Sequence, residues 1–166
     1  ENPKTSAKSP LQGMSKEKIV LRWLGLIVSW CAFVMYANSL GHGYVLDDYS
    51  IILENKLTKQ GWAAIPTIFK TTYRFGYIFV SDDLYRPITK SIFAIQWALS
   101  PNNPSLGHWM NVLSFALTVW ILFNTLNLYS KGNKLFAFIA SLLFMAHPIH
   151  TEVVANIKSL DEILGF

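Results

Sequence analysis

The feature that most constrains this chain is a long apolar run, Trp109–Leu128, which contains no charged residue. An uncharged stretch of about 20 residues is the length that an α-helix needs to cross a bilayer. A second run, 19–40, is similarly long and carries Arg22 as its only charge. Because the bilayer interior offers no water to unpaired backbone groups, these two runs predict membrane-spanning helices.

A third apolar run, Leu135–Ala146, is also uncharged but is shorter than a full span. It predicts a span over 135–149 if the helix continues past Pro148, and otherwise a buried or re-entrant segment. The composition agrees with a membrane protein, since 14% of the residues are charged against about 25% in a soluble domain. The predicted fold class is therefore an all-α polytopic membrane protein.

Lysine positions set the expected orientation of these helices. Four lysines lie in the polar segment 1–18, and Lys131 and Lys134 lie in the turn between the second and third runs. Both regions belong on the cytoplasmic side, so we expect a disordered cytoplasmic tail over 1–18 and an external loop over 41–107. The net charge of +4 then reflects topology and contact with membrane lipids, and nucleic acid is not an expected partner. Residues 19–166 are interpreted as the N-terminal part of a larger integral membrane protein.

The expected external loop contains its own helix. Proline opens a stretch, 87–99, in which four apolar residues fall on one helical face: Ile88, Ile92, Ile95 and Leu99. The stretch is too short to span a bilayer, and its amphipathic pattern predicts a helix that lies in the membrane interface. The acidic pair before it, Asp82-Asp83, is interpreted as solvated loop.

Another acidic pair, Asp47-Asp48, follows the first span within the sequence GYVLDDYSIILEN. Two adjacent carboxylates in apolar surroundings are costly to desolvate and repel each other, which raises the pKa of one of them. They indicate a site that handles a proton or a phosphate-bearing ligand at a membrane face. The alternative is that both carboxylates cap a helix at Tyr49–Leu53, because Asp is favoured at helix N-termini.

Histidines and basic residues supply the other candidate groups. His147 and His150, with Glu152 nearby, could bind zinc but lack the H-E-x-x-H pattern. The alternative is that they form hydrogen bonds at the interface where the third run ends. Arg86 and Lys158 are candidate phosphate contacts, and each is equally expected as an interfacial residue whose charge reaches the headgroups.

Three motifs, taken in order, carry a resemblance to a known family. They are the acidic pair after the first span, RPIT at Arg86–Thr89, and AHPIHTEVVANIKSLDEIL from Ala146 onward. From Tyr36 to its end the chain resembles the N-terminal membrane region of the transmembrane and TPR-repeat-containing O-mannosyltransferase family, especially its bacterial relatives. More distantly it is similar to the GT-C superfamily of polyprenyl-phosphate-dependent glycosyltransferases. It departs from the family in lacking the remaining membrane helices and the TPR array, and in having Lys158-Ser159 where arginine or Gly-Arg is usual.

The resemblance implies GT-C-like transmembrane helices with a structured first external loop. It also implies transfer of a sugar, mannose in this family, from a polyprenyl-phosphate donor to a Ser/Thr or other hydroxyl acceptor at the external membrane face. Asp47 is implied as the catalytic base that takes the acceptor proton, with Asp48 orienting it or holding a divalent metal ion. The residues implied in binding the donor phosphate are Arg86, Lys158, His147, His150 and Glu152. The expected location is the bacterial inner membrane, or the ER membrane in a eukaryote.

The rival expectation is a non-catalytic membrane anchor or scaffold of a TPR-containing protein. A solute transporter is disfavoured, because it predicts charges inside the spans and the second and third runs have none. Further spans with external acidic residues downstream would favour the enzyme. We expect residues 1–166 to be inactive without the rest of the protein.

Overall fold

The long helices follow the apolar runs. The computed structural model describes residues 16–77 and 83–166, so most of the predicted tail, together with Asp82, lies outside the described residues. Helix α1 (Lys16–Tyr36) continues into the short 3-10 helix η1 (Ala37–Gly41), and α4 covers Ser105–Tyr129. Both are long and apolar enough to cross a membrane. Since every regular element in the described residues is a helix, the predicted all-α membrane fold is confirmed. Helix α1 begins at Lys16, inside the segment expected as tail.

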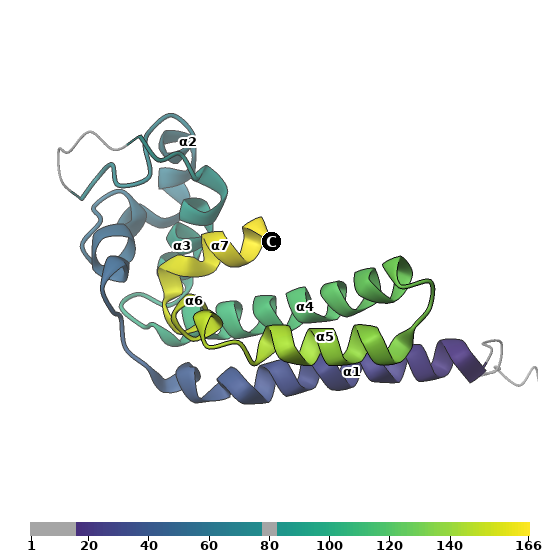
Figure 1. The fold of residues 1–166 in the computed structure, drawn as a ribbon. Helices are drawn as coiled ribbons and strands as arrows, with labels where there is room; N and C mark the ends of the chain where they lie inside the picture. The colour runs from purple at the N-terminus through teal and green to yellow at the C-terminus, as the bar shows by residue number, and fades with distance from the viewer. Residues whose placement is uncertain (1–15, 78–82) are drawn as a thin grey trace, which may run out of the picture.

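Helices α1 and α4 form a bundle with α5 (Lys134–Met145), which lies alongside both (Figure 1). Buried apolar side chains fill its interior, among them Val28, Ala32, Val112, Phe115, Val119 and Met145. Two hydrogen bonds join the helices: Ser29 Oγ donates to the carbonyl of Ala116 at 2.9 Å, and Tyr36 Oη donates to the carbonyl of Met145 at 3.0 Å. Such bonds satisfy polar groups that lipid could not.

The third run forms a broken helix. Helix α5 ends at Met145, and α6 (Ile149–Ala155) leaves it at an angle of 68°. Pro148 lies at the break, because proline has no N–H to donate and disfavours helical backbone in the residue before it. The predicted span 135–149 is therefore not one continuous helix, and the pair is either a bent span or the re-entrant segment that its length allowed. The 3-10 helix η4 (Ile157–Ser159) and α7 (Leu160–Gly165) follow, and α7 lies in the angle between the bundle and the loop before α4 (Figure 1).

The loop between α1 and α4 is folded, as expected, and is called the loop unit below. Its elements are the π-helical turn η2 (Tyr49–Leu53), the 3-10 helix η3 (Thr58–Ala64), and the helices α2 (Ile65–Ile68) and α3 (Pro87–Leu99). Asn55 is buried at its centre, where its Oδ1 accepts from the N–H groups of Leu57 and Thr58, each at 3.0 Å. Its Nδ2 donates to the carbonyls of Ser50 and Phe75. One side chain therefore ties three parts of the loop together.

Helix α3 packs on η3 at a glycine. Gly61 has a φ of +62°, and a Cβ built on it would lie 2.8 Å from the Cβ of Ala98. Because of the left-handed backbone and this close approach, any larger residue at Gly61 would be destabilising. This contact holds the two main helical segments of the loop unit together.

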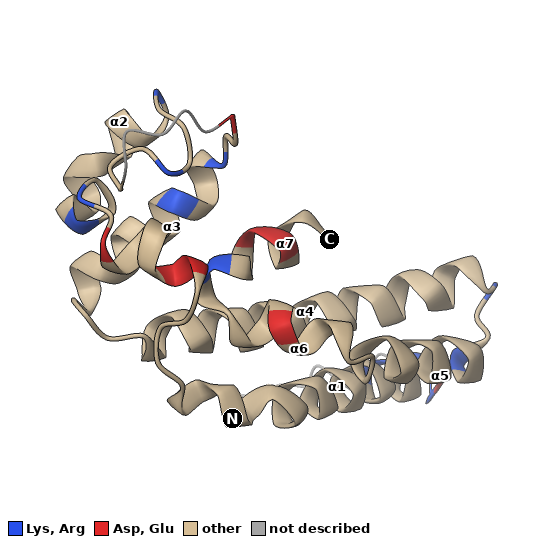
Figure 2. Cartoon of the chain, turned by 60° about the vertical axis from the view of Figure 1, so that its left-hand side comes forward, with Lys and Arg blue, Asp and Glu red and all other residues tan. Residues whose placement is uncertain are grey.

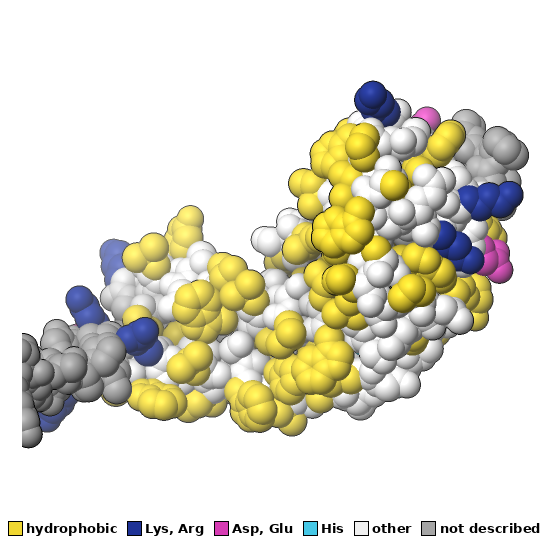
Figure 3. All heavy atoms as spheres, turned by 180° about the vertical axis from the view of Figure 1, so that it is seen from behind, with side chains coloured by type: hydrophobic (Ala, Val, Ile, Leu, Met, Phe, Trp, Pro, Cys, Tyr) yellow, Lys and Arg dark blue, Asp and Glu magenta, His cyan; other side chains and the backbone are white. Residues whose placement is uncertain are grey.

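Helix α3 buries several polar side chains beside its apolar core residues Phe93 and Ala94, and it exposes the two ends of its predicted apolar stripe. Thr89, Lys90 and Gln96 are buried, and Lys90 Nζ donates to a loop carbonyl, that of Phe75, at 2.8 Å. The two ends of the predicted apolar stripe, Ile88 and Leu99, are 67% and 66% exposed. From behind, hydrophobic side chains are seen spread over the surface of both the bundle and the loop unit (Figure 3). The middle of the stripe, at Ile92 and Ile95, is half-buried, and Ile92 packs against a buried cluster of the loop unit. The placement of α3 in the membrane interface stays a prediction.

Candidate functional site

The acidic pair consists of one buried and one accessible carboxylate. Asp48 is 0% exposed, whereas the side chain of Asp47 is 48% exposed. The side chain of Asp48 makes no capping hydrogen bond to η2, so the expected capping role is not what it performs. The main chain of Asp47 supports this turn instead, because its carbonyl accepts from Ser50 Oγ at 2.9 Å.

Asp48 ties the loop unit to the segment that follows α6. Its Oδ2 accepts from the backbone N–H of Val45 at 3.0 Å, and its Oδ1 accepts from the backbone N–H of Lys158 at 2.7 Å. Burial raises the pKa of Asp48 above its usual value, and backbone N–H groups, chiefly those of Val45 and Lys158, act in the opposite direction. Both oxygens of this carboxylate are therefore engaged inside the protein.

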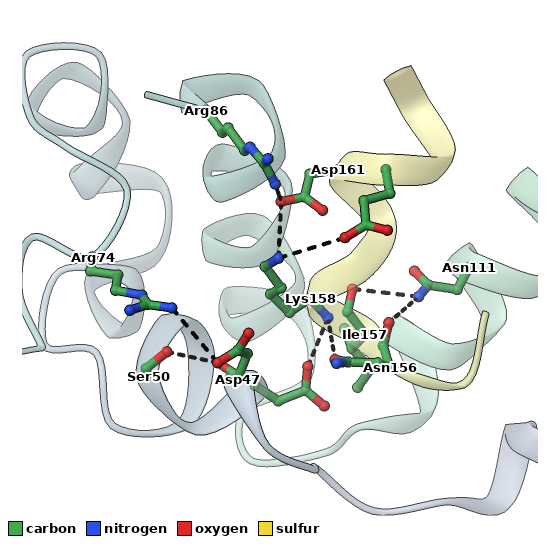
Figure 4. A network of polar contacts seen from close by, with 11 residues as sticks. Asp47, Ser50, Arg74, Arg86, Asn111, Asn156, Ile157, Lys158 and Asp161 are labelled. Carbon is green, nitrogen blue, oxygen red and sulfur yellow. Dashed lines mark hydrogen bonds and ion pairs between the residues drawn. The ribbon is translucent and has the colours of Figure 1, made fainter. Parts of the chain in front are cut away.

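The segment 156–158 is also held from the bundle side. The buried Asn111 of α4 donates from Nδ2 to the carbonyl of Asn156 at 2.7 Å. Ile157 packs against α4 at Gly107, where a Cβ would lie only 2.6 Å from its Cγ2. We call residues 156–158 the clamped segment, because Asp48 accepts a hydrogen bond from its Lys158 N–H and Asn111 donates one to its Asn156 carbonyl. Figure 4 shows Asn111 beside this segment.

Charged side chains extend this contact from Lys158 to α3. Arg86, which precedes α3, forms an ion pair with Asp161 at the start of α7. Lys158 Nζ lies 3.7 Å from the same Asp161 oxygen and 3.9 Å from Glu162 Oε1. The guanidinium of Arg86 also lies over the ring of Tyr73, 5.8 Å from its centroid. The hydrogen bond that Arg86 donates to Asp161 raises the pKa of Arg86, so the guanidinium stays charged.

Asp47 lies at the accessible end of these contacts (Figure 4). Its Oδ1 is 3.8 Å from a guanidinium nitrogen of Arg74, and both side chains are about half exposed. An exposed ion pair of this kind contributes about 0–1 kcal/mol, so it does not withdraw the carboxylate from solvent. The polar network defined by these contacts consists of Asp47, Asp48, Arg74, Arg86, Lys158, Asp161 and Glu162. Charged residues elsewhere are sparse along the middle of the long helices (Figure 2).

A groove of about 360 Å³ opens beside Arg86, between the start of α3 and α7. Its polar wall is formed by Arg86, Asp161 and Glu162, and its apolar wall includes Ile88 and Leu164. Arg86 has five N–H donors, and its side chain is 36% exposed. The groove can therefore offer a guanidinium to an anionic group next to an apolar surface.

The predicted histidine cluster lies apart from Arg86 and Lys158. His150 is buried against aromatic rings, with its centroid 4.4 Å from that of Phe144 and 5.2 Å from that of Phe115. It lines a second cavity, of about 330 Å³ and mostly apolar, that also touches Glu162. His147 and Glu152 are exposed. Among the predicted site residues, the network joins the acidic pair with Arg86 and Lys158 and does not include this cluster.

The described residues contain no preformed cluster of three metal-ligating side chains. In residues 16–77 and 83–166, no group of three or more His, Cys, Asp or Glu side chains is arranged to hold a metal ion. Asp48 in particular has both oxygens bonded to backbone N–H groups. A divalent metal can also be held by one or two carboxylates together with substrate phosphates, so the expected metal ion stays a prediction.

Several residues that belong to the polar network or contact it have little signal in the sequence. Asp161 follows Lys158 by three residues, the spacing of a helical ion pair, and this pattern could have indicated it. Arg74, Tyr73 and Asn111 stand in loop or apolar surroundings without such a pattern. Their roles depend on contacts between distant segments.

Comparison with known proteins gives the chain its relatives. It is 34% identical over 133 residues to human protein O-mannosyl-transferase TMTC3, 35% over 143 residues to the mouse protein of that name, and 30% over 149 residues to the protein O-mannosyl-transferase F38B6.6 of Caenorhabditis elegans. These matches cover 78%, 84% and 84% of the chain but only 14%, 15% and 21% of the relatives, so the chain spans a small part of their length. No protein-family model and no solved structure matches. The chain belongs to the TMTC family of protein O-mannosyl-transferases.

Proposed function

We propose that the protein containing this chain transfers a mannosyl group from a polyprenyl-phosphate donor to a Ser/Thr or other hydroxyl acceptor at the external membrane face. The names of its relatives support mannosyl transfer to protein. The observation that carries the proposal is the accessible carboxylate of Asp47, which belongs to a polar network at the end of the helical bundle.

The proposed reaction exchanges one bond at the anomeric carbon. The acceptor oxygen forms a bond to that carbon, the bond from the carbon to the phosphate oxygen breaks, and the acceptor proton passes to a carboxylate. The polyprenyl phosphate leaves with the electron pair of the broken bond. Such a step needs a base within reach of the acceptor and a cation near the departing phosphate.

Asp47 is the better candidate for the base. A base must approach the acceptor hydroxyl to within about 2.6–3.2 Å, and the half-exposed Asp47 side chain permits this. Asp48 is fully buried, and each of its oxygens already accepts a backbone N–H. Its burial supports a role in positioning Lys158 instead.

Arg86 and Lys158 are the proposed phosphate contacts. Arg86 borders a groove with one polar and one apolar wall, a combination that suits a phosphate carrying an apolar chain. Its pairing with Asp161 engages one guanidinium nitrogen and leaves other donors of the fork for an anion. A role for His147, His150 and Glu152 in donor binding is part of the same proposal, with the cavity beside His150 as its support.

One observation favours the rival function, a non-catalytic anchor or scaffold. Arg74, Arg86 and Lys158 each already lie beside a carboxylate of this chain. A network in which each cation already faces a carboxylate needs no ligand, and it would serve equally well to hold the loop unit on the bundle. If the protein is a transferase, substitution of Asp47 should lower transfer. If it is a scaffold, the wild type has no transfer activity and the substitution should have no effect.

The test is mannosyl transfer by the full-length protein in liposomes, with a polyprenyl-phosphate mannose donor and a Ser/Thr-containing acceptor protein. We expect Asp47→Asn to lower the turnover number by about 10²–10⁴-fold and to leave donor affinity nearly unchanged. The matched control is Asp83→Asn, an exposed loop carboxylate, which should keep wild-type turnover. Near-normal turnover of folded Asp47→Asn would reject Asp47 as the base, and absence of transfer by the wild type would favour the scaffold.

A further inference from the structure

The carboxylate of Asp48 joins two segments that are 110 residues apart in the sequence. We infer that Asp48 is a positioning residue: it fixes Lys158 and the cation pair relative to Asp47, and it does not itself accept the proton. This inference rests on the proposed function and assigns a second, distinct role within the same acidic pair.

The geometry at Asp48 requires a carboxylate. Its two oxygens accept from two different backbone N–H groups, those of Val45 at 3.0 Å and Lys158 at 2.7 Å. Asparagine offers one carbonyl oxygen, and its NH₂ group would face the remaining N–H donor. Since the site is closed to solvent, water cannot replace the lost acceptor. The other acceptor of the Lys158 N–H, Asn156 Oδ1, is more distant at 3.2 Å.

Asp48 positions Lys158 and Arg86 through the clamped segment. Asn111 fixes the carbonyl of Asn156 at 2.7 Å from the bundle side, so removal of Asp48 frees one side of the segment only. In the structure, the Nζ of Lys158 lies 3.7 Å from Asp161, and Asp161 in turn pairs with Arg86. A shift of Lys158 therefore displaces the proposed phosphate contacts, whereas Asp47 keeps its own turn through the Ser50 hydrogen bond.

This arrangement predicts different kinetic effects for the two neighbouring aspartates. Loss of a base lowers the turnover number and spares donor binding, whereas loss of a residue that positions the donor contacts raises the donor KM. In the full-length protein we expect Asp48→Asn to raise the donor KM about tenfold, the size of one lost charge-assisted hydrogen bond. The pH dependence of turnover should remain that of the wild type, because Asp47 is intact.

Lys158→Met provides the matching variant. If Asp48 acts through Lys158, this substitution should raise the donor KM to a similar degree, and the double variant should be no worse than the more affected single one. Asp48→Glu should restore part of the donor affinity, because it returns both acceptor oxygens. A fall in turnover at unchanged donor KM in Asp48→Asn, with an altered pH profile, would overturn the inference and make Asp48 the base.

A second measurement is independent of transfer. Spin labels at the exposed positions Lys56, in the loop unit, and Glu152, in α6, report the distance between the two parts that Asp48 joins. Asp48→Asn should broaden this distance distribution, and Asp83→Asn should leave it as in the wild type. An unchanged distribution in Asp48→Asn would overturn the inference even if the wild type transfers mannose. A broadened one would support the positioning role even if the proposed function fails.

Discussion

Asp161 lies between two cations, Arg86 and Lys158, and its side chain is 3% exposed. Replacement by asparagine keeps the shape and removes the charge that both cations face. Loss of one partner of a fully buried pair costs about 3–5 kcal/mol. Arg86 is one-third exposed, so for Asp161→Asn we expect the free energy of unfolding to fall by about 1–3 kcal/mol. The shift of the thermal unfolding midpoint in detergent measures it.

Glu162→Gln is the control for this prediction. Glu162 also faces Lys158, at 3.9 Å, but its side chain is 51% exposed. Water screens such a pair, and its loss should cost only about 0–1 kcal/mol. Equal shifts for the two variants would show that burial does not strengthen the Asp161 contacts.

The sequence indicates which residue types matter in the network but not how each is used. The adjacent carboxylates, Arg86 and Lys158 stand out because charges are rare in this chain. Whether Asp47 or Asp48 is buried depends on a hydrogen bond to Lys158, and no local pattern reveals a partner 110 residues away. The histidines stand out equally, yet His150 packs among aromatic rings instead. Chemical type can be read locally, whereas the burial of an individual side chain depends on tertiary contacts.

The stability of the loop unit depends on the contact between η3 and α3 at Gly61. Gly61→Ala places a Cβ 2.8 Å from that of Ala98 and forces a side chain onto a φ of +62°. Left-handed backbone and overpacking together should destabilise the loop unit by about 2–4 kcal/mol. The measurement is the temperature at which protease cleaves the loop unit of the full-length protein in membranes.

Gly41→Ala is the matched control for the loop unit, because a Cβ there meets no atom within 4 Å. It should leave the cleavage temperature unchanged. A Gly61→Ala protein with wild-type resistance would mean that α3 and η3 separate or shift at little cost. The packing assigned to this contact would then be wrong.

The depth of α3 in the membrane is a second property of an element. Labels at its exposed ends, Ile88 and Leu99, should both report headgroup depth by quenching, because a helix of 13 residues is too short to cross. A label at Leu117, exposed and halfway along α4, should report the bilayer interior. If either end of α3 matches the depth of Leu117, the helix does not lie in the interface.

The lengths of the apolar runs were enough to predict the long helices of the bundle. The features that they did not predict depend on contacts with other segments. Long apolar runs with at most one charge predicted α1 and α4 to within a few residues. The break after Met145 follows from Pro148, although its angle of 68° depends on how α6 packs. The burial of Lys90 in α3 was beyond reach, because its partner carbonyl at Phe75 belongs to a loop without any periodic pattern.

At the scale of the whole molecule, charge separates the two ends of the bundle. The start of α1 and the start of α5 lie together, as the 4.0 Å contact between Glu17 and Lys134 shows. The lysines of the short segments that flank the spans, Lys16, Lys18, Lys131 and Lys134, therefore lie at one end of the bundle, whereas the polar network and the cations of the long loop unit lie at the other (Figure 2). Lysines in short segments beside a span keep that end in the cytoplasm, and long loops are translocated largely regardless of charge, so the loop unit and Asp47 should face the external side.

Cysteine labelling of the full-length protein in sealed vesicles tests this orientation. Cysteines are placed at Lys56, exposed in the loop unit, and at Tyr129, exposed at the end of α4, in a background from which Cys31 and other reactive cysteines are removed. With the external face outward, an impermeant reagent should modify Lys56→Cys at once and Tyr129→Cys only after permeabilisation. The opposite pattern would place Asp47 in the cytoplasm. Donor and acceptor would then have to meet the network there, and transfer at the external face would be excluded.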